Sequence, residues 1–228
     1  MTNDFDSCLQ SGGHLRRHLR RHLRRLPATA LNLLAAVVLA MPLAAQAQRA
    51  PSASEAAAYQ GLHRAAWQGD LPALDRLLQA GADTEARDAF GPTPLHVATY
   101  ARQREAIRRL AAAKSRLDAL EQQRYDAVTI ASVADDPETL ALLLSLGASA
   151  RQITSPYDGT ALIAAAHLGH VEVVRQLIAA GAPLDHVNNL HWTALIESIV
   201  LGDGGVRHQQ TLDLLVSAGA DLRLADAQ

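Results

Sequence analysis

The sequence has few of the residues that support disulfide or thiolate chemistry. It contains one cysteine, Cys8, among 228 residues, and aromatic residues make up only 4%. Cys8 lies ahead of the segment that we expect to fold, so that segment has no thiol available for a disulfide or a nucleophile.

The motifs of common enzymes and metal sites are also missing. The glycine-rich stretch 202–205 lacks the preceding strand and the lysine of a phosphate-binding loop, and no nucleophile elbow occurs. One set of candidate metal ligands could lie close together in the fold, but it lacks the sequence spacing of a metal site: His186, His191, Asp203 and His208. We therefore expect that the protein is not an enzyme and that it binds no metal and no cofactor.

The first 47 residues have the composition of an export signal. His-Leu-Arg-Arg occurs three times over 14–25, an apolar run follows over 28–41, and Ala45-Gln46-Ala47 supplies a small-x-small cleavage site. We expect cleavage after Ala47 and a mature protein that is periplasmic or secreted. The alternative is an uncleaved anchor, because 28–47 is almost long enough to span a bilayer.

The charge of the chain changes when this leader is removed. The whole chain has a net charge of −2, but the leader holds six arginines and two aspartates, so 15 basic and 21 acidic residues remain and the net charge becomes −6. An acidic domain is a poor partner for nucleic acid, and we expect no membrane association after cleavage. Residues 48–56, which include Pro51, Ser52 and Ser54, are predicted to be a disordered linker.

A helix-opening pattern recurs about every 33 residues along the rest of the chain. It occupies 61–66, 93–99, 126–132, 160–166 and 193–199. An amphipathic stretch follows each copy, and in four copies this second helix is predicted to end at a glycine, where a left-handed residue is needed: Gly81, Gly147, Gly181 and Gly219. Neither helix could bury its apolar stripe alone, so neighbouring copies must stack.

Three copies depart from the pattern. The second copy has Lys114-Ser115 where the glycine is expected, which predicts a poorly defined helix end. The third is one residue longer, and we place the extra residue in the hairpin tip 152–157. The fifth has about four additional residues, which predict a mobile glycine-rich loop over 202–208.

The Thr-Pro-Leu-His motif at 93–96, the Ala-Gly-Ala-Asp ending at 80–83 and the 33-residue step resemble the ankyrin repeat family over 57–228. The resemblance implies an all-α solenoid of about five helix-turn-helix repeats with short hairpin tips. Their approximate bounds are 57–90, 91–123, 124–156, 157–189 and 190–228. It also implies that His63 and His96 tie turns to their neighbours, and that the protein is a non-catalytic module that binds another protein. We expect an adaptor or scaffold in the bacterial cell envelope.

In such a stack the inner helices and hairpin tips form a concave face. We predict that two rows of side chains on the inner helices contact the partner. The first row is Arg64, Val97, Ile130, Ala164 and Glu197, and the second is Trp67, Tyr100, Val133, His167 and Val200. Trp67 and Tyr100 are typical interface anchors, although such aromatic residues also fill space over neighbouring helices.

A second patch is predicted over 185–208. It contains His191 and Trp192 in a hairpin tip, with Tyr157, Asp158 and the loop residues Asp203, Arg207 and His208 nearby. This patch supports an alternative function as a small-molecule or metal-binding regulator, and a secreted effector directed at a host protein is a third hypothesis.

The last repeat lacks a polar capping repeat after it. A truncated reading frame, coverage by the partner, or self-association through Leu201, Leu214 and Leu215 would each account for this.

Overall fold

The computed structural model describes residues 48–224, so the predicted signal peptide and its cleavage site lie outside the described residues. The chain divides into two units at Arg49 and Ala50, and the second unit contains all the helices discussed below. Within the described residues, every helix is too short or too polar to cross a membrane.

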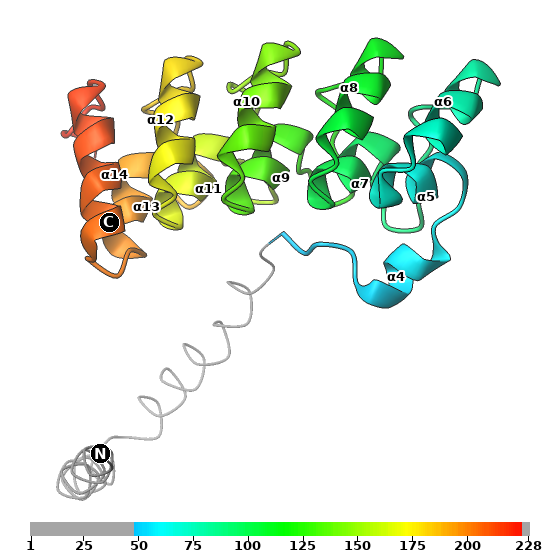
Figure 1. Ribbon diagram of the computed structural model, residues 1–228. Helices are drawn as coiled ribbons and strands as arrows, with labels where there is room; N and C mark the ends of the chain where they lie inside the picture. The colour runs from blue at the N-terminus through cyan, green and yellow to red at the C-terminus, as the bar shows by residue number, and fades with distance from the viewer. Residues whose placement is uncertain (1–47, 225–228) are drawn as a thin grey trace, which may run out of the picture. The chain divides into compact units, whose positions relative to one another are not determined.

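Five pairs of short helices stand side by side in this unit (Figure 1). The first, inner helix of each pair is α5 (Gly61–Gln68), α7 (Pro94–Tyr100), α9 (Ala127–Val133), α11 (Ala161–His167) or α13 (Ala194–Val200). The second, outer helix is α6 (Leu71–Gln79), α8 (Arg104–Ala112), α10 (Pro137–Ser145), α12 (Val171–Ala179) or α14 (Val206–Ser217). This arrangement confirms the predicted all-α solenoid, and each predicted repeat holds one pair.

A short helix, α4 (Ala53–Ala58), precedes the pairs. The Ser52 hydroxyl accepts the N–H of Glu55, and the Glu55 carboxylate accepts the N–H of Ser52 at 2.6 Å, which together form a capping box. The predicted disordered linker over 48–56 is therefore wrong for residues 53–56, because these local hydrogen bonds satisfy the first turn of a helix.

The helix starts follow the expected capping chemistry. The hydroxyls of Thr160 and Thr193 accept the N–H groups of Ile163 and Ile196, both at 3.3 Å. In the third repeat the Asp126 carboxylate takes the same role and accepts the N–H of Thr129 at 2.7 Å. The first turns of α9, α11 and α13 are thus fixed by the residue immediately before each helix, whereas Gln60 before α5 makes no such side-chain hydrogen bond.

The outer helices end in left-handed residues, including the one that lacks glycine. Lys114 has φ of 64° and Gly81 has φ of 76°. After α8, the N–H of Ser115 donates to the Leu110 carbonyl at 3.0 Å, as the N–H of Ala82 donates to Leu77 after α6. The prediction of a poorly defined helix end in the second repeat is wrong, because the backbone makes the same closing bonds with lysine in the strained position.

The core runs as one apolar layer between the inner and outer helices. Small inner-helix side chains are buried at equivalent positions: Ala65, Ala98, Ala131 and Ala165. Larger side chains of the outer helices fill the space against them, among them Leu74, Leu110, Leu143, Leu177 and Leu215. Burying each leucine stabilises the fold by roughly 1.5–3 kcal/mol.

The two insertions take different forms. The stretch from the cap Leu146 to the cap Thr160 is one residue longer than the stretch from Ala113 to Asp126, so the third repeat's extra residue lies in the hairpin tip as predicted. In the fifth repeat, α14 has 12 residues where α12 has nine. Residues 206–208 therefore belong to a helix, and the predicted loop is shorter than expected.

Candidate functional site

One of the two predicted rows lies along the C-terminal ends of the inner helices. Tyr100, Val133, His167 and Val200 are the last residues of α7, α9, α11 and α13. Trp67 is the next-to-last residue of α5, so the row follows the stack from one end to the other. Trp67, Tyr100, Val133 and His167 are half-buried and Val200 is exposed, so part of each residue is open for contact.

The other predicted row is mostly inaccessible. Val97 and Ile130 are fully buried, so their assignment as contact residues is wrong. Both lie in helices that have an inner helix on either side, and these neighbours cover the middle of α7 and α9. Arg64 stays exposed because α5 has an inner neighbour on one side only, while Ala164 is half-buried.

Glu197, a third member of that row, is buried and joins a hairpin tip to two inner helices. Its Oε2 atom lies 3.2 Å from Nδ1 of His167, and its Oε1 atom accepts a hydrogen bond from the Asn188 amide at 2.8 Å. The Asn188 side chain in turn accepts the N–H groups of Leu190 and Trp192, both at 3.0 Å. The structure thus brings His167 and Glu197 together, and the Glu197 side chain holds the hairpin tip against the inner helices.

The histidines of the repeat motif tie neighbouring turns together, as the resemblance implied. Nε2 of His63 lies 3.1 Å from the Pro92 carbonyl, and Nε2 of His96 lies 2.9 Å from the Ala119 carbonyl. Burial lowers the pKa of His96 to about 4, so its imidazole is neutral at physiological pH. Nδ1 of His170 lies 2.8 Å from the Ser132 carbonyl in the same kind of contact. These side chains therefore have structural partners in the adjacent repeats.

The predicted patch over 185–208 is divided between the two ends of α13. The hairpin tip packs on the preceding tip, where Nε2 of His186 lies 2.6 Å from the Asp158 carbonyl. At the other end, Arg207 donates to the Gly169 carbonyl at 2.9 Å and to Asp135 at 2.8 Å. The intervening helix is about 10 Å long, so these groups do not form one site.

The remaining residues of that patch also have local roles. His191 is exposed and takes a left-handed conformation in the turn, with φ of 63°. Trp192 is half-buried, and its N–H is held by Asn188. Across residues 48–224, no three His, Cys, Asp or Glu side chains gather in a way that could hold a metal ion.

Tyr59 extends the aromatic end of the accessible row, and sequence reasoning missed it. Its ring lies edge-on to Trp67 at 6.0 Å and 5.8 Å from the ring of His63. Burial, followed by the charge of Asp88, raises the pKa of the Tyr59 hydroxyl above its ordinary value. The spacing of 59, 63 and 67 at four-residue steps was the signal in the sequence that could have found this cluster.

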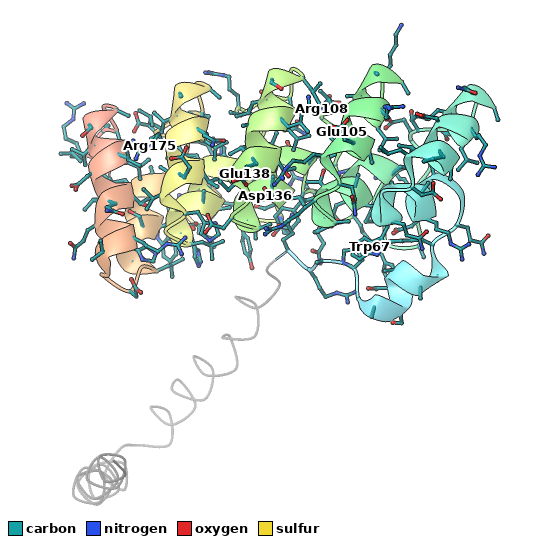
Figure 2. All side chains as sticks on the ribbon, in the orientation of Figure 1. Trp67, Glu105, Arg108, Asp136, Glu138 and Arg175 are labelled. Atoms are coloured by element: carbon teal, nitrogen blue, oxygen red, sulfur yellow. The ribbon has the colours of Figure 1, made fainter. Side chains whose placement is uncertain are left out.

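The outer helices present a different surface. Glu105 pairs with Arg108 on α8 at 3.2 Å, and Glu172 pairs with Arg175 on α12 at 3.2 Å. Figure 2 shows Arg108 and Arg175 on these helices, whereas Trp67 lies on α5 at the end of the stack. Exposed pairs of this kind contribute little stability, with a median of about 0–1 kcal/mol. The surfaces of α8 and α12 thus carry charged pairs, whereas Trp67, Tyr100 and Val133 lie on inner helices.

The stacked helix pairs, the left-handed helix ends and the histidine ties define an ankyrin repeat protein. The family described as "Ankyrin repeats (3 copies)" matches residues 62–154 and 128–226, and the chain belongs to this family. Proteins of the family are generally non-catalytic, and this chain is a protein–protein interaction module.

Relatives of known sequence or structure have the same repeats. The chain is 29% identical to a putative ankyrin repeat protein, YahD, of Escherichia coli K12, over 71% of this chain and 81% of YahD. It is similar to an ankyrin repeat domain of Acinetobacter baumannii AYE, with 42% identity and a TM-score of 0.69, over 73% of this chain and 84% of that one. The ankyrin repeat protein EF0377 gives 28% identity and a TM-score of 0.65 over 74% and 87% of the two chains.

Proposed function

We propose that the protein is an adaptor or scaffold of the bacterial cell envelope that binds another protein through the accessible row of the inner helices. The observation that carries this proposal is the continuous series of half-buried or exposed side chains at the helix ends: Trp67, Tyr100, Val133, His167 and Val200. Partly buried aromatic side chains supply large contact areas and lose little conformational freedom on binding.

The experiment that tests this surface is affinity capture from an envelope extract, followed by titration of the captured protein. The test variant is Val133→Asp with Val200→Asp, which places charge on the row and leaves the ties of the hairpin tips intact. The control variant is Arg108→Ala with Arg175→Ala, which removes exposed side chains from the outer helices.

We expect the row variant to bind the captured protein at least about tenfold more weakly, which corresponds to about 1.4 kcal/mol. The control variant should bind as the unchanged chain does. Circular dichroism and thermal unfolding establish that all three proteins fold. Equal binding by a folded row variant would contradict the proposed surface.

Export rests on the leader sequence alone. We propose cleavage after Ala47, supported by the small-x-small site that follows the apolar run. N-terminal sequencing of the protein from a periplasmic fraction should begin at Gln48. An Ala47→Asp variant should accumulate with its leader attached, and a wild-type protein that retains residues 1–47 would contradict this proposal.

A further inference from the structure

One side-chain contact near the C-terminal end of the stack skips a whole repeat. Nη2 of Arg207, in the fifth repeat, donates to Oδ2 of Asp135, in the third repeat, at 2.8 Å. Stacked repeats contact their neighbours, and the fourth repeat separates these two: Figure 1 shows α12 between α10 and α14. The ties made by His170 and His208 each join adjacent repeats. Arg207 therefore adds a link that the repeat pattern does not supply.

The insertion in the fifth repeat brings Arg207 into this position. His170 and His208 occupy equivalent places, each 11 residues before the glycine that closes its outer helix. In the fourth repeat the outer helix begins after His170, whereas in the fifth it begins at Val206, before His208. Arg207 thus belongs to an additional helical turn, and its counterpart in the fourth repeat is Gly169, in the joint between inner and outer helix.

The additional turn packs closely over that joint. Nε of Arg207 donates to the Gly169 carbonyl at 2.9 Å, and Nε2 of His208 lies 2.9 Å from the His167 carbonyl. Gly169 has φ of 65°, and a Cβ atom there would lie 3.2 Å from the His208 ring. The absence of a side chain at Gly169 lets the turn approach. One guanidinium is therefore held at two points, by a carbonyl of the fourth repeat and a carboxylate of the third.

Asp135 occupies the joint of the third repeat, between α9 and α10. It takes a left-handed conformation with φ of 48°, and the first and fourth repeats have glycine at this position. Aspartate adopts this conformation more readily than most residues, but glycine does so without steric cost. The other carboxylate oxygen of Asp135 lies 4.0 Å from Nδ1 of His170. The contact with Arg207 thus gives this residue a role that glycine could not fill.

We propose that Arg207 is a clamp that couples the fifth repeat to the third, so that the last repeat does not open independently of the stack. Within residues 48–224 no further repeat covers the open face of the last one, where Ile199 is 59% exposed. The three repeats that the clamp spans have inner helices ending at Val133, His167 and Val200. The clamp therefore also fixes how these side chains lie relative to one another.

Hydrogen–deuterium exchange of the full chain, measured on its peptides by mass spectrometry, tests the clamp without a partner protein. The test variants are Arg207→Gln, Asp135→Gly and the double variant. We expect each single substitution to speed the exchange of α14 amides at least about threefold, because the last repeat opens more often. The double variant should exchange no faster than Arg207→Gln alone, because both substitutions remove the same contact.

Arg124→Gln is the matched control. Arg124 pairs with Asp158 at 2.6 Å and is 47% exposed, against 58% for Arg207, but its pair joins adjacent repeats. This variant should leave the exchange of α14 unchanged. Salt gives a second measurement, because about 1 M NaCl screens an exposed ion pair much more than about 0.1 M does. Added salt should speed α14 exchange in the wild-type chain more than in Arg207→Gln.

Circular dichroism establishes that each variant folds. Unchanged α14 exchange in folded Arg207→Gln, additive effects in the double variant, or an equal effect of Arg124→Gln would each overturn the clamp. If Arg207→Gln does not fold, Asp135→Gly decides between the outcomes, since it carries a residue that this joint has in two other repeats. The exchange experiment is independent of the capture experiment, so either proposal can fail without the other.

Discussion

Ser115 is a single side chain in an unfavourable environment. It is buried, its hydroxyl has no hydrogen-bond partner, and alanine occupies the corresponding position of the other repeats: Ala82, Ala148, Ala182 and Ala220. We predict that Ser115→Ala raises the free energy of unfolding by about 1 kcal/mol, because an unsatisfied polar group is removed from the core.

Urea unfolding monitored by circular dichroism measures the effect of Ser115→Ala. Ser132→Ala is the control, because the buried Ser132 hydroxyl donates to the Val128 carbonyl at 2.7 Å. Removing that hydroxyl gives up a hydrogen bond, so the control should not be stabilised. A Ser115→Ala variant no more stable than the wild type would contradict the prediction.

Two other buried residues give opposite dependences of stability on pH. Burial lowers the pKa of His96 from 6.5 to about 4, so the unfolded chain binds more protons between these values and stability increases as pH rises. Burial raises the pKa of Asp126 from 3.8 to about 6, so the folded chain binds more protons and stability decreases as pH rises through this window. Each effect is on the order of 2–3 kcal/mol, and the two largely cancel between pH 4 and 6.

Variants separate these two contributions. We predict that Asp126→Asn, which keeps an acceptor at the helix start, gains stability as pH rises from 4 to 6. We predict that His96→Gln loses stability over the same range. Urea unfolding at closely spaced pH values gives both slopes, and parallel curves for the two variants would show that these groups do not control the profile.

At the scale of the helix, Lys114 tests the cost of a left-handed residue. It has φ of 64° at the end of α8, where four other repeats have glycine. A side chain in this conformation is strained, whereas glycine loses more freedom on folding, and the first effect is the larger. We predict that Lys114→Gly stabilises the protein by about 0.5–1 kcal/mol. Thermal unfolding should show a higher midpoint temperature for Lys114→Gly than for the wild type. The midpoint of Lys114→Ala should not rise, because this variant loses the charge but keeps the strained backbone.

The helices were predictable because each one depends on residues close to it in the sequence. Thr193 caps α13, Gly81 closes α6, and their spacing repeats along the chain. The burial of Val97 was not predictable in this way, because the neighbouring helices on both sides of α7 cover it. Asn188 was missed for the same reason: its partner Glu197 lies nine residues away, beyond the turn that Asn188 itself stabilises.

At the scale of the whole molecule, the two ends of the stack differ. The first end has α4 and the aromatic cluster around Tyr59, so part of its surface is covered. The last repeat leaves apolar side chains open, with Ile199 59% and Val206 68% exposed. Equivalent positions to Ile199 are buried beneath the next repeat throughout the stack, and they hold small residues: Ala66, Thr99, Ser132 and Ala166. Ile199 is therefore larger than the residues that fit between two stacked repeats.

Such an apolar face favours burial against a second copy of the chain, and we predict concentration-dependent self-association through Ile199 and Leu201. Leu214 is half-buried and Leu215 fully buried against the core, so Leu215 is not available for this contact. Ile199→Asp should weaken association at least about tenfold, because it places a charge in the contact. Ile153→Asp is the control, since Ile153 is exposed in a hairpin tip away from the last repeat. Sedimentation velocity over a range of concentrations measures the self-association of the wild-type chain and of both variants. A wild-type chain that stays monomeric, or a control variant that weakens association equally, would exclude this face as the contact.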